Sequence, residues 1–427
     1  MTILLVLSGL IALMMLGIPI AFAIGIAAWG YVLAAGIPQI VLAQQIGNGP
    51  DSWILLAMPL FVMAGLLMNE TGISTRLIAF AEALVGHLRG GLAMVNVVAA
   101  MLFGGISGSA VADATALGSI LIPGMTKAGY PKEFSAALTS SSGSIGIIIP
   151  PSIPMILYGA ITGVSVSTLF VAGILPGLLM GMSQMAIIYV LARKFGWGGS
   201  VPFEWKRLGL AARDAALGLF MPLIIMGGIL GGIFTPTEAG AIAVVYGIAV
   251  SVFFYRTLTW NRLYRTLIDS AIITSIVMIM VSTSFALGWV MTFERIPQEV
   301  AAWFLDLNLG REAFLIVVCL ILIGLGCIMH GDPMMLLTVP ILMPSVKALG
   351  VDPVHFGILV VLCVAIGQQT PPVGSTLFVV AALSGKDIFA ITRANIPFIV
   401  AMVSLTLLIL FVPQLVTSIN AFMLPPR

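Results

Sequence analysis

The stretch 104-GGISGSAVADA-114 decides the fold, because it places three glycines, two serines and an acid within a long apolar run. MVNVVAAMLF precedes it and TALGSILIPGM follows it. The chain has 427 residues, of which 60% are hydrophobic and only 8% charged, whereas roughly a quarter of the residues are charged in soluble domains. Its apolar runs are continuous and lack the alternation of membrane barrel strands. The composition therefore predicts an all-α polytopic membrane protein.

Six segments have about the 20 apolar residues that a helix needs to cross a bilayer. They are 53–69, 168–192, 214–234, 239–256, 266–290 and 393–422. Residues 2–36 are too long for one crossing, and LGIP at 16–19 predicts a break between two short helices. The N-terminal run has neither a basic start nor a small-residue cleavage site, so we expect a retained helix there.

Residues 91–126 are better explained by a re-entrant hairpin than by two crossings. About 13 apolar residues lead from Gly91 to Phe103 and roughly a dozen from Ala114 to Met125, so each arm matches about half a bilayer. Polar residues such as Arg89 flank the outer ends. Residues 104–114 would then form the tip of the hairpin.

The segment FSAALTSSSGSIGIIIPPSIPMILYGAI at 134–161 predicts a broken transmembrane helix. Its length suits one crossing, but Pro150-Pro151 removes two backbone donors and pushes the preceding residue out of helical geometry. Irregular backbone inside a membrane persists only where it is buried in protein or lines a wet cavity. We therefore expect the hairpin tip and this break to meet in one site.

The second half of the chain repeats these landmarks in the same order. Pro19 aligns with Pro236, the tip aligns with 324-GLGCIMHGDP-333, and Pro150-Pro151 align with Pro371-Pro372. Basic residues at 76–89, 127–132 and 193–213 mark the cytoplasmic side, so the hairpin at 313–347 enters the membrane from the opposite side. This pattern predicts two inverted-topology repeats, with a binding site near the midplane where the breaks converge.

The predicted organisation follows from the repeat. The first repeat comprises a scaffold (1–72), an interfacial arm (73–90), a transport domain (91–165, with hairpin 91–126 and broken helix 131–161), and a connecting helix with a cytoplasmic loop (166–213). The second comprises a scaffold (214–290), an interfacial arm (291–312), a transport domain (313–385, with hairpin 313–347 and broken helix 353–384), and a C-terminal helix (386–427). The arms carry the arginine, glutamate and tryptophan residues that suit headgroup level.

The motifs GGISGSAVADA, SSGSIG-x-x-IPPS, HGDP and GQQTPPVG resemble those of the large membrane subunit of tripartite ATP-independent periplasmic (TRAP) transporters. The resemblance runs from about residue 5 to residue 420. It implies a sodium-driven elevator-type importer of organic acids in the bacterial inner membrane. It also implies two partners, a small four-helix membrane subunit and a periplasmic substrate-binding protein. The architecture is similar to that of divalent-anion/sodium symporters, which need no binding protein.

Sodium prefers several oxygen ligands, and unwound carbonyls, helix C-terminal ends and hydroxyl groups can supply them. We therefore expect two or more Na+ sites and no organic cofactor. Candidates for the first site are Ser107, Gly108 and Ser109 at the tip with Ser142, Gly143 and Pro150 in the broken helix. Candidates for the second site are Gly326, Gly331, Gly367, Thr370 and Pro371. The alternative is that the glycines and serines only allow close helix packing.

The acidic and amide residues near the breaks leave alternatives open. Asp113 and Asp332 begin the outgoing arms, where an aspartate can cap a helix. Asp113 is also a candidate Na+ ligand, and Asp332 precedes Pro333, which suits the first helical position. The candidate substrate contacts are Ser144, Gln369 and Thr370, beside half-helix N-termini that favour anions. Gln369 could instead pair with the neighbouring repeat.

Two rival functions remain from the sequence. One is a stand-alone divalent-anion/sodium symporter, which would work without a binding protein. The other is a membrane-embedded hydrolase with Ser107 or Ser141 as nucleophile, but a nucleophilic serine needs a base within reach. The sequence contains no GxSxG elbow, and its histidines lie away from these serines. We therefore expect a transporter and not an enzyme, with no nucleic acid partner. The substrate stays open among C4-dicarboxylates, sialic acids and similar carboxylates.

Overall fold

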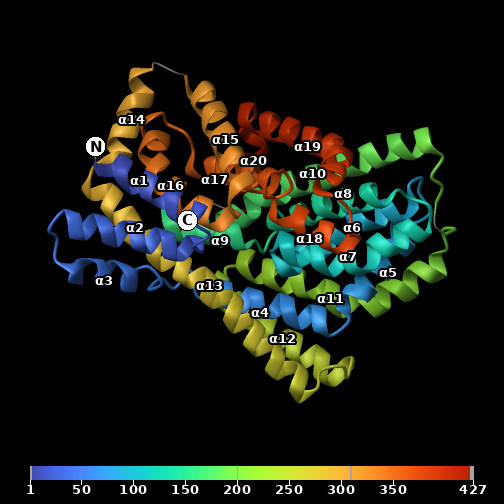
Figure 1. Ribbon diagram of the computed structural model, residues 1–427. Coiled ribbons are helices and arrows are strands. Elements are labelled where there is room, and N and C mark those ends of the chain that lie inside the picture. The colour runs from blue at the N-terminus through green and yellow to red at the C-terminus, as the bar shows by residue number, and fades with distance from the viewer. Residues whose placement is uncertain (1, 200, 308–309, 424–427) are drawn as a thin grey trace.

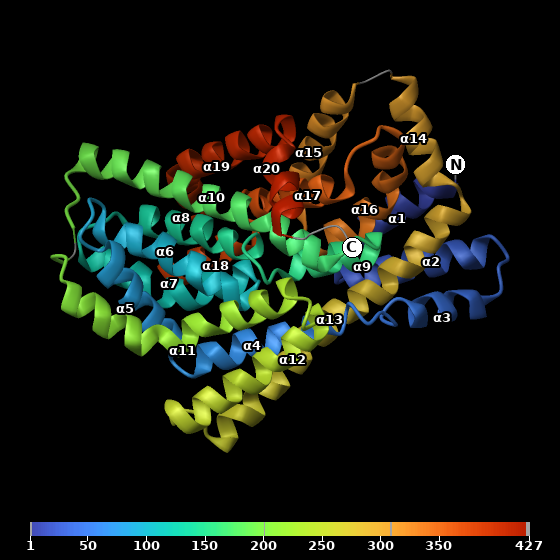
Figure 2. The same cartoon turned by 180° about the vertical axis from the view of Figure 1, so that it is seen from behind.

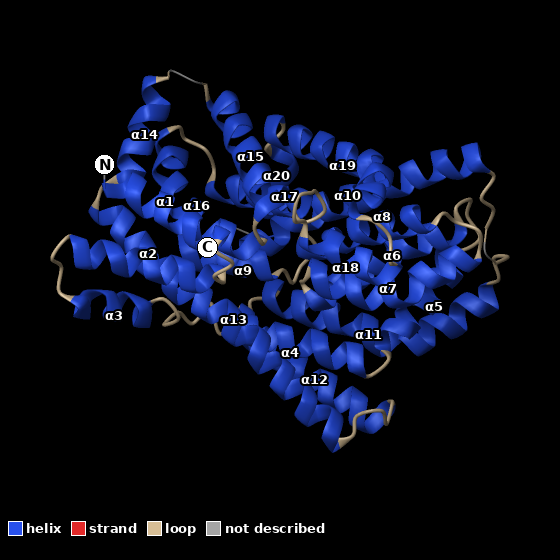
Figure 3. Cartoon of the chain, in the orientation of Figure 1, coloured by secondary structure: helices blue, strands red, loops and turns tan. Residues whose placement is uncertain are grey.

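The computed structural model describes residues 2–199, 201–307 and 310–423, and every regular element in these ranges is a helix (Figures 1 and 3). The all-α prediction is confirmed for this part of the chain. Residues 1, 200, 308–309 and 424–427 lie outside the described residues; they belong to the predicted first scaffold, cytoplasmic loop, second interfacial arm and C-terminal helix.

Among the described residues of the first half there are ten α-helices and one short 3-10 helix. They are α1 (Thr2–Met15), α2 (Ile20–Ala34), α3 (Gln39–Asn48), α4 (Ala57–Glu70), α5 (Ile73–Val85), α6 (Gly91–Ser107), α7 (Ala110–Lys127), α8 (Lys132–Gly143), η1 (Ser144–Ile147), α9 (Ile153–Thr162) and α10 (Val166–Phe195).

The second half follows the same order. Its helices are α11 (Trp205–Leu230), α12 (Pro236–Ala249) with a π-helical extension η2 (Val250–Phe254), α13 (Trp260–Phe293), α14 (Ile296–Asp306), α15 (Arg311–Ile328), α16 (Gly331–Ala348), α17 (Pro353–Gly367), α18 (Ser375–Ser384), α19 (Ile388–Phe411) and α20 (Gln414–Met423).

Within the described ranges, six helices are long and apolar enough to cross a membrane: α10, α11, α12 with η2, α13, α15 and α19. The chain is therefore a multi-pass membrane protein. The crossing predicted at 53–69 is shorter than expected, because α4 has only 14 residues, which is about 21 Å of helix. The break predicted within 2–36 is present between α1 and α2, where Gly17 has a positive φ of 81°.

Both hairpins and both broken helices occur where the sequence predicts them, but the hairpin arms are longer than expected. The arms of the first hairpin have 17 residues in α6 and 18 in α7, or about 26 Å each. The glycine-serine patch does not end α6 early, because Gly104 to Ser107 continue the helix. Each arm of the first hairpin is therefore nearly as long as the roughly 30 Å hydrocarbon core of a bilayer is thick.

The single C-terminal helix predicted for 386–427 is wrong. The chain forms α19 and α20 instead, and α19 ends at Phe411, before Val412 and Pro413. The reason is that Pro413 has no backbone N–H and its ring clashes with the preceding turn. The helix α3 was not predicted; it packs against α13 and α2.

The hairpins and broken helices lie between two sets of outer helices. Figures 1 and 2 show α10 and α19 along one side of this region and α4, α11 and α12 along the other. Within it, α18 from the second half packs on α7 and α8 of the first. In the corresponding way, α9 from the first half packs on α16 and α17 of the second. Each half therefore covers the hairpin of the other.

Bare glycine backbone sets the closest approach between each hairpin and its broken helix. A Cβ on Gly104 would lie 2.5 Å from the Cα of Gly146. A Cβ on Gly367 would lie 2.6 Å from the carbonyl carbon of Gly326. No side chain fits at such separations, so glycine is required where each inbound arm crosses its break.

We predict that Gly367→Ala destabilises the folded protein, because the new methyl group collides with the backbone of α15. Overpacking of this kind costs about 1–3 kcal/mol, and thermal unfolding in detergent would show a lower Tm. The matched control is Gly324→Ala on the hairpin arm α15, where a Cβ meets nothing within 4 Å. Equal Tm values for the two variants would contradict the glycine crossing.

Candidate cation and substrate site

The first break lies between η1 and α9. Residues 148–152 are not helical, and the Pro150-Pro151 peptide bond is cis. Ser152 begins the second half of the helix: its hydroxyl accepts from the N–H of Met155 at 3.3 Å and donates to the carbonyl of Ile147. The break therefore leaves a short run of backbone without helical hydrogen bonds, as the proline pair predicts.

The tip of the first hairpin lies directly on this break. Gly108 ends α6 in the left-handed conformation with φ of 61°, and its carbonyl accepts from the N–H of Ile153 at 3.4 Å. A Cβ on Gly108 would lie 2.7 Å from the carbonyl oxygen of Pro151. The structure thus brings together the candidates Ser107, Gly108 and Pro150, with Ser109 half-buried beside them.

Asp113 is fully buried next to the tip, at 0% exposure. One carboxylate oxygen, Oδ1, accepts a hydrogen bond from the Ser107 hydroxyl, and the other, Oδ2, has no partner. The carboxylate faces Gly146, where any side chain would collide with it. A buried carboxylate is costly unless it is paired, so this position calls for a cation or a proton.

The predicted caps of the two outgoing arms are wrong in detail. Ser109, not Asp113, caps α7, since its Oγ accepts from the N–H of Ala112 at 3.4 Å. His330 occupies the cap position of α16, and no side chain caps that helix. Asp332 lies in the first turn, with Oδ2 3.6 Å from Nδ1 of His330. In both arms the aspartate lies inside the helix, after the N-cap position, and therefore does not cap it.

Hydroxyl groups of α8 form hydrogen bonds with side-chain amides of two other helices. Asn96 on α6 donates to Thr139 at 2.7 Å and accepts from Ser142 at 2.8 Å. Gln184 on α10 donates to the Ser141 hydroxyl at 3.0 Å. The candidate ligand Ser142 therefore has a protein partner, and Gly143, next to it, packs against the start of α7.

Ser144, a candidate substrate contact, is buried and donates to the carbonyl of Ser140 at 3.1 Å. Its hydroxyl is thus turned back along its own helix. Asn96 and Gln184 are not among the residues predicted from the sequence, although a single amide in an apolar helix is a usual sign of a hydrogen bond between membrane helices.

The second break lies between α17 and α18 and repeats the geometry of the first. Its Pro371-Pro372 peptide bond is cis, and the N–H of Val373 donates to the carbonyl of Cys327 at the end of α15 at 2.9 Å. Gly331, at the start of α16, packs against Val364 of α17. The candidates Gly326 and Gly367 are thus in contact, and Gly331 lies against the same helix just before the break that contains Pro371. Thr370 donates to the carbonyl of Ile366 at 2.7 Å.

The two adjacent glutamines of this break have different roles. Gln369 is buried, and its Oε1 accepts from Asn395 of α19 at 3.0 Å, so its side chain is held by the C-terminal region. Gln368, which the sequence analysis did not select, is only 3% exposed and its Oε1 has no partner. Ser375 Oγ, at the start of α18, is also buried without a partner. Gln368 Oε1 and Ser375 Oγ are thus free acceptors at the second break.

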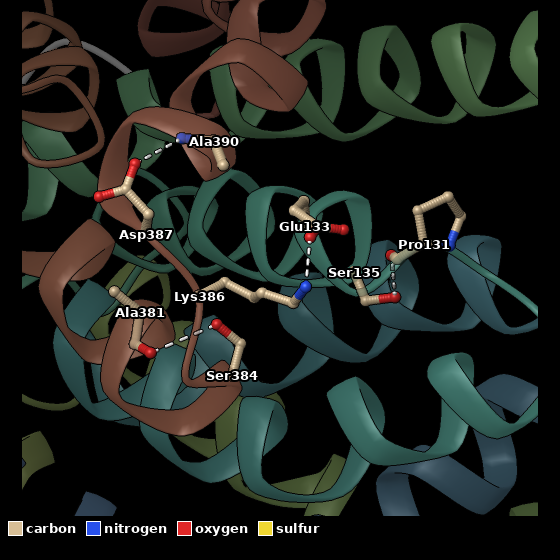
Figure 4. A network of polar contacts seen from close by, with 8 residues as sticks. All are labelled: Pro131, Glu133, Ser135, Ala381, Ser384, Lys386, Asp387 and Ala390. Carbon is tan, nitrogen blue, oxygen red and sulfur yellow. Dashed lines mark hydrogen bonds and ion pairs between the residues drawn. The ribbon is translucent and has the colours of Figure 1, made fainter.

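Hydrogen bonds and an ion pair join the two broken helices. Figure 4 shows Lys386, in the loop after α18, reaching Glu133 in the first turn of α8, with Nζ 2.7 Å from Oε1. Asp387 holds the same loop by capping α19 through the N–H groups of Phe389 and Ala390. On the other broken helix, the Tyr158 hydroxyl of α9 donates to the carbonyl of Pro353 at the start of α17 at 2.7 Å.

Comparison with known proteins identifies the family. Residues 7–415 match the family model of the tripartite ATP-independent periplasmic transporter, DctM component. The chain belongs to the DctM family. It is 40% identical over 372 residues to the C4-dicarboxylate TRAP transporter large permease protein DctM of Pseudomonas aeruginosa, which covers 87% of each chain.

Other relatives show the range of the family and the fold. The chain is 36% identical over 407 residues to the sialic acid TRAP transporter large permease protein SiaM of Vibrio cholerae, covering 95% of each chain. The crystal structure of the Alcanivorax borkumensis YdaH transporter has the same fold, with a TM-score of 0.64 over 87% of this chain and 86% of that chain. At 15% identity, this likeness concerns the fold alone.

We predict that Asn96→Leu weakens the packing of the first hairpin on α8. The substitution keeps the volume roughly constant but leaves Thr139 and Ser142 only carbonyls of their own helix as partners. Hydrogen bonds between membrane helices contribute about 0.6 kcal/mol each on average, so the Tm in detergent should fall by a few degrees. Thr126→Val is the control, because the Thr126 hydroxyl bonds only within α7. A Tm for Asn96→Leu equal to that of the control would contradict the role of Asn96.

Proposed function

We propose that this chain is the large permease of a TRAP system that imports an organic acid together with sodium. Membership of the DctM family supports a binding-protein-dependent organic acid transporter. The observation that carries the finer proposal is that each break holds buried oxygens without partners. They are Asp113 Oδ2 at the first break, and Gln368 Oε1 and Ser375 Oγ at the second. Buried polar atoms normally have partners, so these oxygens suit a bound cation.

The first Na+ site would use the Asp113 carboxylate, the Ser107 hydroxyl and carbonyls of the tip and break, including those of Gly108 and Pro150. A carboxylate offsets the charge of the ion, which is costly to bury alone. Ser142 would act indirectly, because its hydroxyl is held by Asn96. This assigns Asp113 a direct role and leaves Ser109 as the helix cap.

The second Na+ site would have no carboxylate in direct contact and would use neutral oxygens. Gln368 Oε1, Ser375 Oγ and the carbonyls near Gly326, Gly367 and Thr370 are the available groups. A site without a carboxylate binds Na+ more weakly unless a second charge is near, and the carboxylate of a bound substrate would provide one. This arrangement makes substrate and sodium binding mutually dependent.

The substrate would be an anion with at least one carboxylate. The first turns of α16 and α18 have no side-chain cap, so their N–H groups and helix dipoles are available to an anion. Relatives are named for C4-dicarboxylates and for sialic acid, which share a carboxylate and differ in size. Thr370 is half-buried, and its hydroxyl, which donates to the Ile366 carbonyl, can still accept a hydrogen bond, whereas Ser144 and Gln369 are fully buried.

Transport would proceed by an elevator movement of the hairpins and broken helices as one body. The ion pair of Lys386 with Glu133 and the hydrogen bond of Tyr158 with Pro353 support such a unit, because they join the two halves. The arms α5 and α14 would connect this unit to a scaffold of α2, α4, α12 and α13. We place the chain in the bacterial inner membrane, together with a small membrane subunit and a periplasmic binding protein.

Uptake into proteoliposomes tests this function. The permease would be reconstituted with the small subunit, and radiolabelled C4-dicarboxylate and sialic acid would be offered with the cognate binding protein. We expect uptake only with an inward sodium gradient and the binding protein, and none with potassium or choline. Uptake without any binding protein would instead support the stand-alone symporter.

We predict that Asp113→Asn reduces sodium-driven uptake at least tenfold and raises the sodium concentration needed for half-maximal uptake. The amide keeps the shape of the side chain but removes the charge that would offset the ion. Removing one partner of a buried ion pair costs several kcal/mol. The matched control is Asp269→Asn, since Asp269 is exposed on α13. Wild-type sodium dependence in Asp113→Asn would remove Asp113 from the site.

A further inference from the structure

A polar contact between the two halves lies deep inside the protein, close to both breaks. Ser140 on α8 and Thr376 on α18 are each 0% exposed, and their hydroxyl oxygens are 2.9 Å apart. Thr376 Oγ1 is also 2.7 Å from the carbonyl oxygen of Gln368, at the end of α17. Three residues from two halves thus form one continuous chain of hydrogen bonds.

The direction of this chain follows from the number of protons. A hydroxyl group has one proton to donate, and the carbonyl of Gln368 can only accept. Thr376 must therefore donate to Gln368 and accept from Ser140. The order is Ser140 to Thr376 to Gln368, which leaves the two hydroxyl groups with fixed orientations.

Both ends of the chain adjoin groups of the proposed cation sites. Ser140 is one helical turn before Ser144, whose hydroxyl donates to the Ser140 carbonyl at 3.1 Å, and it lies on the same helix as Ser142, which Asn96 holds. At the other end, Gln368 has the free side-chain oxygen of the second break. A change in the position of Gln368 is thus transmitted to α8 through two hydrogen bonds.

The contact is not a general consequence of the repeated fold. When Pro150 is aligned with Pro371, Ser140 corresponds to Val361 and Thr376 corresponds to Met155. The equivalent positions in the other half are therefore apolar, so their side chains cannot form this hydrogen bond. Packing alone does not explain why one half has a buried hydrogen-bonded pair, because apolar residues occupy the equivalent positions in the other half.

We infer that Ser140 and Thr376 are positioning residues that couple the two breaks, so that sodium binding at one favours sodium binding at the other. This rests on the proposed function. A cation bound near Gln368 fixes the end of α17, and the hydrogen-bond chain then holds α8 in the position that the first site needs. Coupling of this kind is reciprocal between the two sites.

The test is the sodium dependence of uptake by Ser140→Ala and Thr376→Val in the reconstituted complex. We expect the half-saturating sodium concentration to rise about threefold, the effect of one hydrogen bond between membrane helices, and the sodium curve to become less steep. The double variant should be no worse than Thr376→Val alone, because both changes break the same chain. Ser140→Thr, which keeps the hydroxyl, should restore the steepness.

The control is Thr406→Val, which removes a hydroxyl that is 3% exposed and bonds only to the Met402 carbonyl of its own helix. A lower Tm in Ser140→Ala with a sodium curve identical to that of Thr406→Val would mean that the contact only stabilises the fold, and would overturn the inference. If wild-type uptake is independent of sodium, the proposed function itself fails. A steep wild-type curve that neither variant changes removes only the coupling.

Discussion

The structure depends on one constraint: backbone that leaves helical geometry inside a membrane must find hydrogen-bond partners within the protein. Each break meets this constraint through the hairpin of its own half. The N–H of Ile153 donates to Gly108, and the N–H of Val373 donates to Cys327. Glycine pairs let the hairpin backbone come close enough for these bonds. The hairpins are therefore the elements that make the two breaks possible.

The same arrangement joins the hairpins and broken helices of the two halves through packing and polar contacts. The second part of each broken helix leaves its own half and packs on the hairpin of the other. Lys386 with Glu133, and Tyr158 with Pro353, then fasten it to the first turn of the opposite broken helix. Separating the halves would expose irregular backbone to lipid, so a movement of the whole unit costs less than a movement within it.

Sequence reasoning predicted the hairpins, the breaks and their repetition, because glycine tips and proline pairs act locally on the backbone. It did not predict which oxygens remain free. That outcome depends on which helix packs beside each residue, and the partners Asn96, Gln184 and Asn395 come from distant parts of the chain. Gln368 and Gln369 show why: they are adjacent at the end of α17, yet Gln369 is bonded to Asn395 and the Gln368 side-chain oxygen has no partner. The sequence alone does not distinguish them.

The lengths of the elements were also hard to predict. Serine and glycine between Gly104 and Ser107 were expected to end the inbound arm, but burial keeps them helical. Pro413 indicates the break after α19, but the prediction counted only apolar residues and therefore missed it. In these two cases the position of a helix end depends on proline and on burial by neighbouring helices more than on the polarity of the segment.

The most direct test of the account is amide hydrogen exchange of the purified protein in sodium and in potassium. The central claim is that the two breaks together hold sodium. We expect sodium to slow exchange at residues 104–114 and 144–152 and also at 326–331 and 367–376, with little change in the lipid-facing parts of α12 and α13. Identical exchange of both breaks in the two salts would contradict the claim.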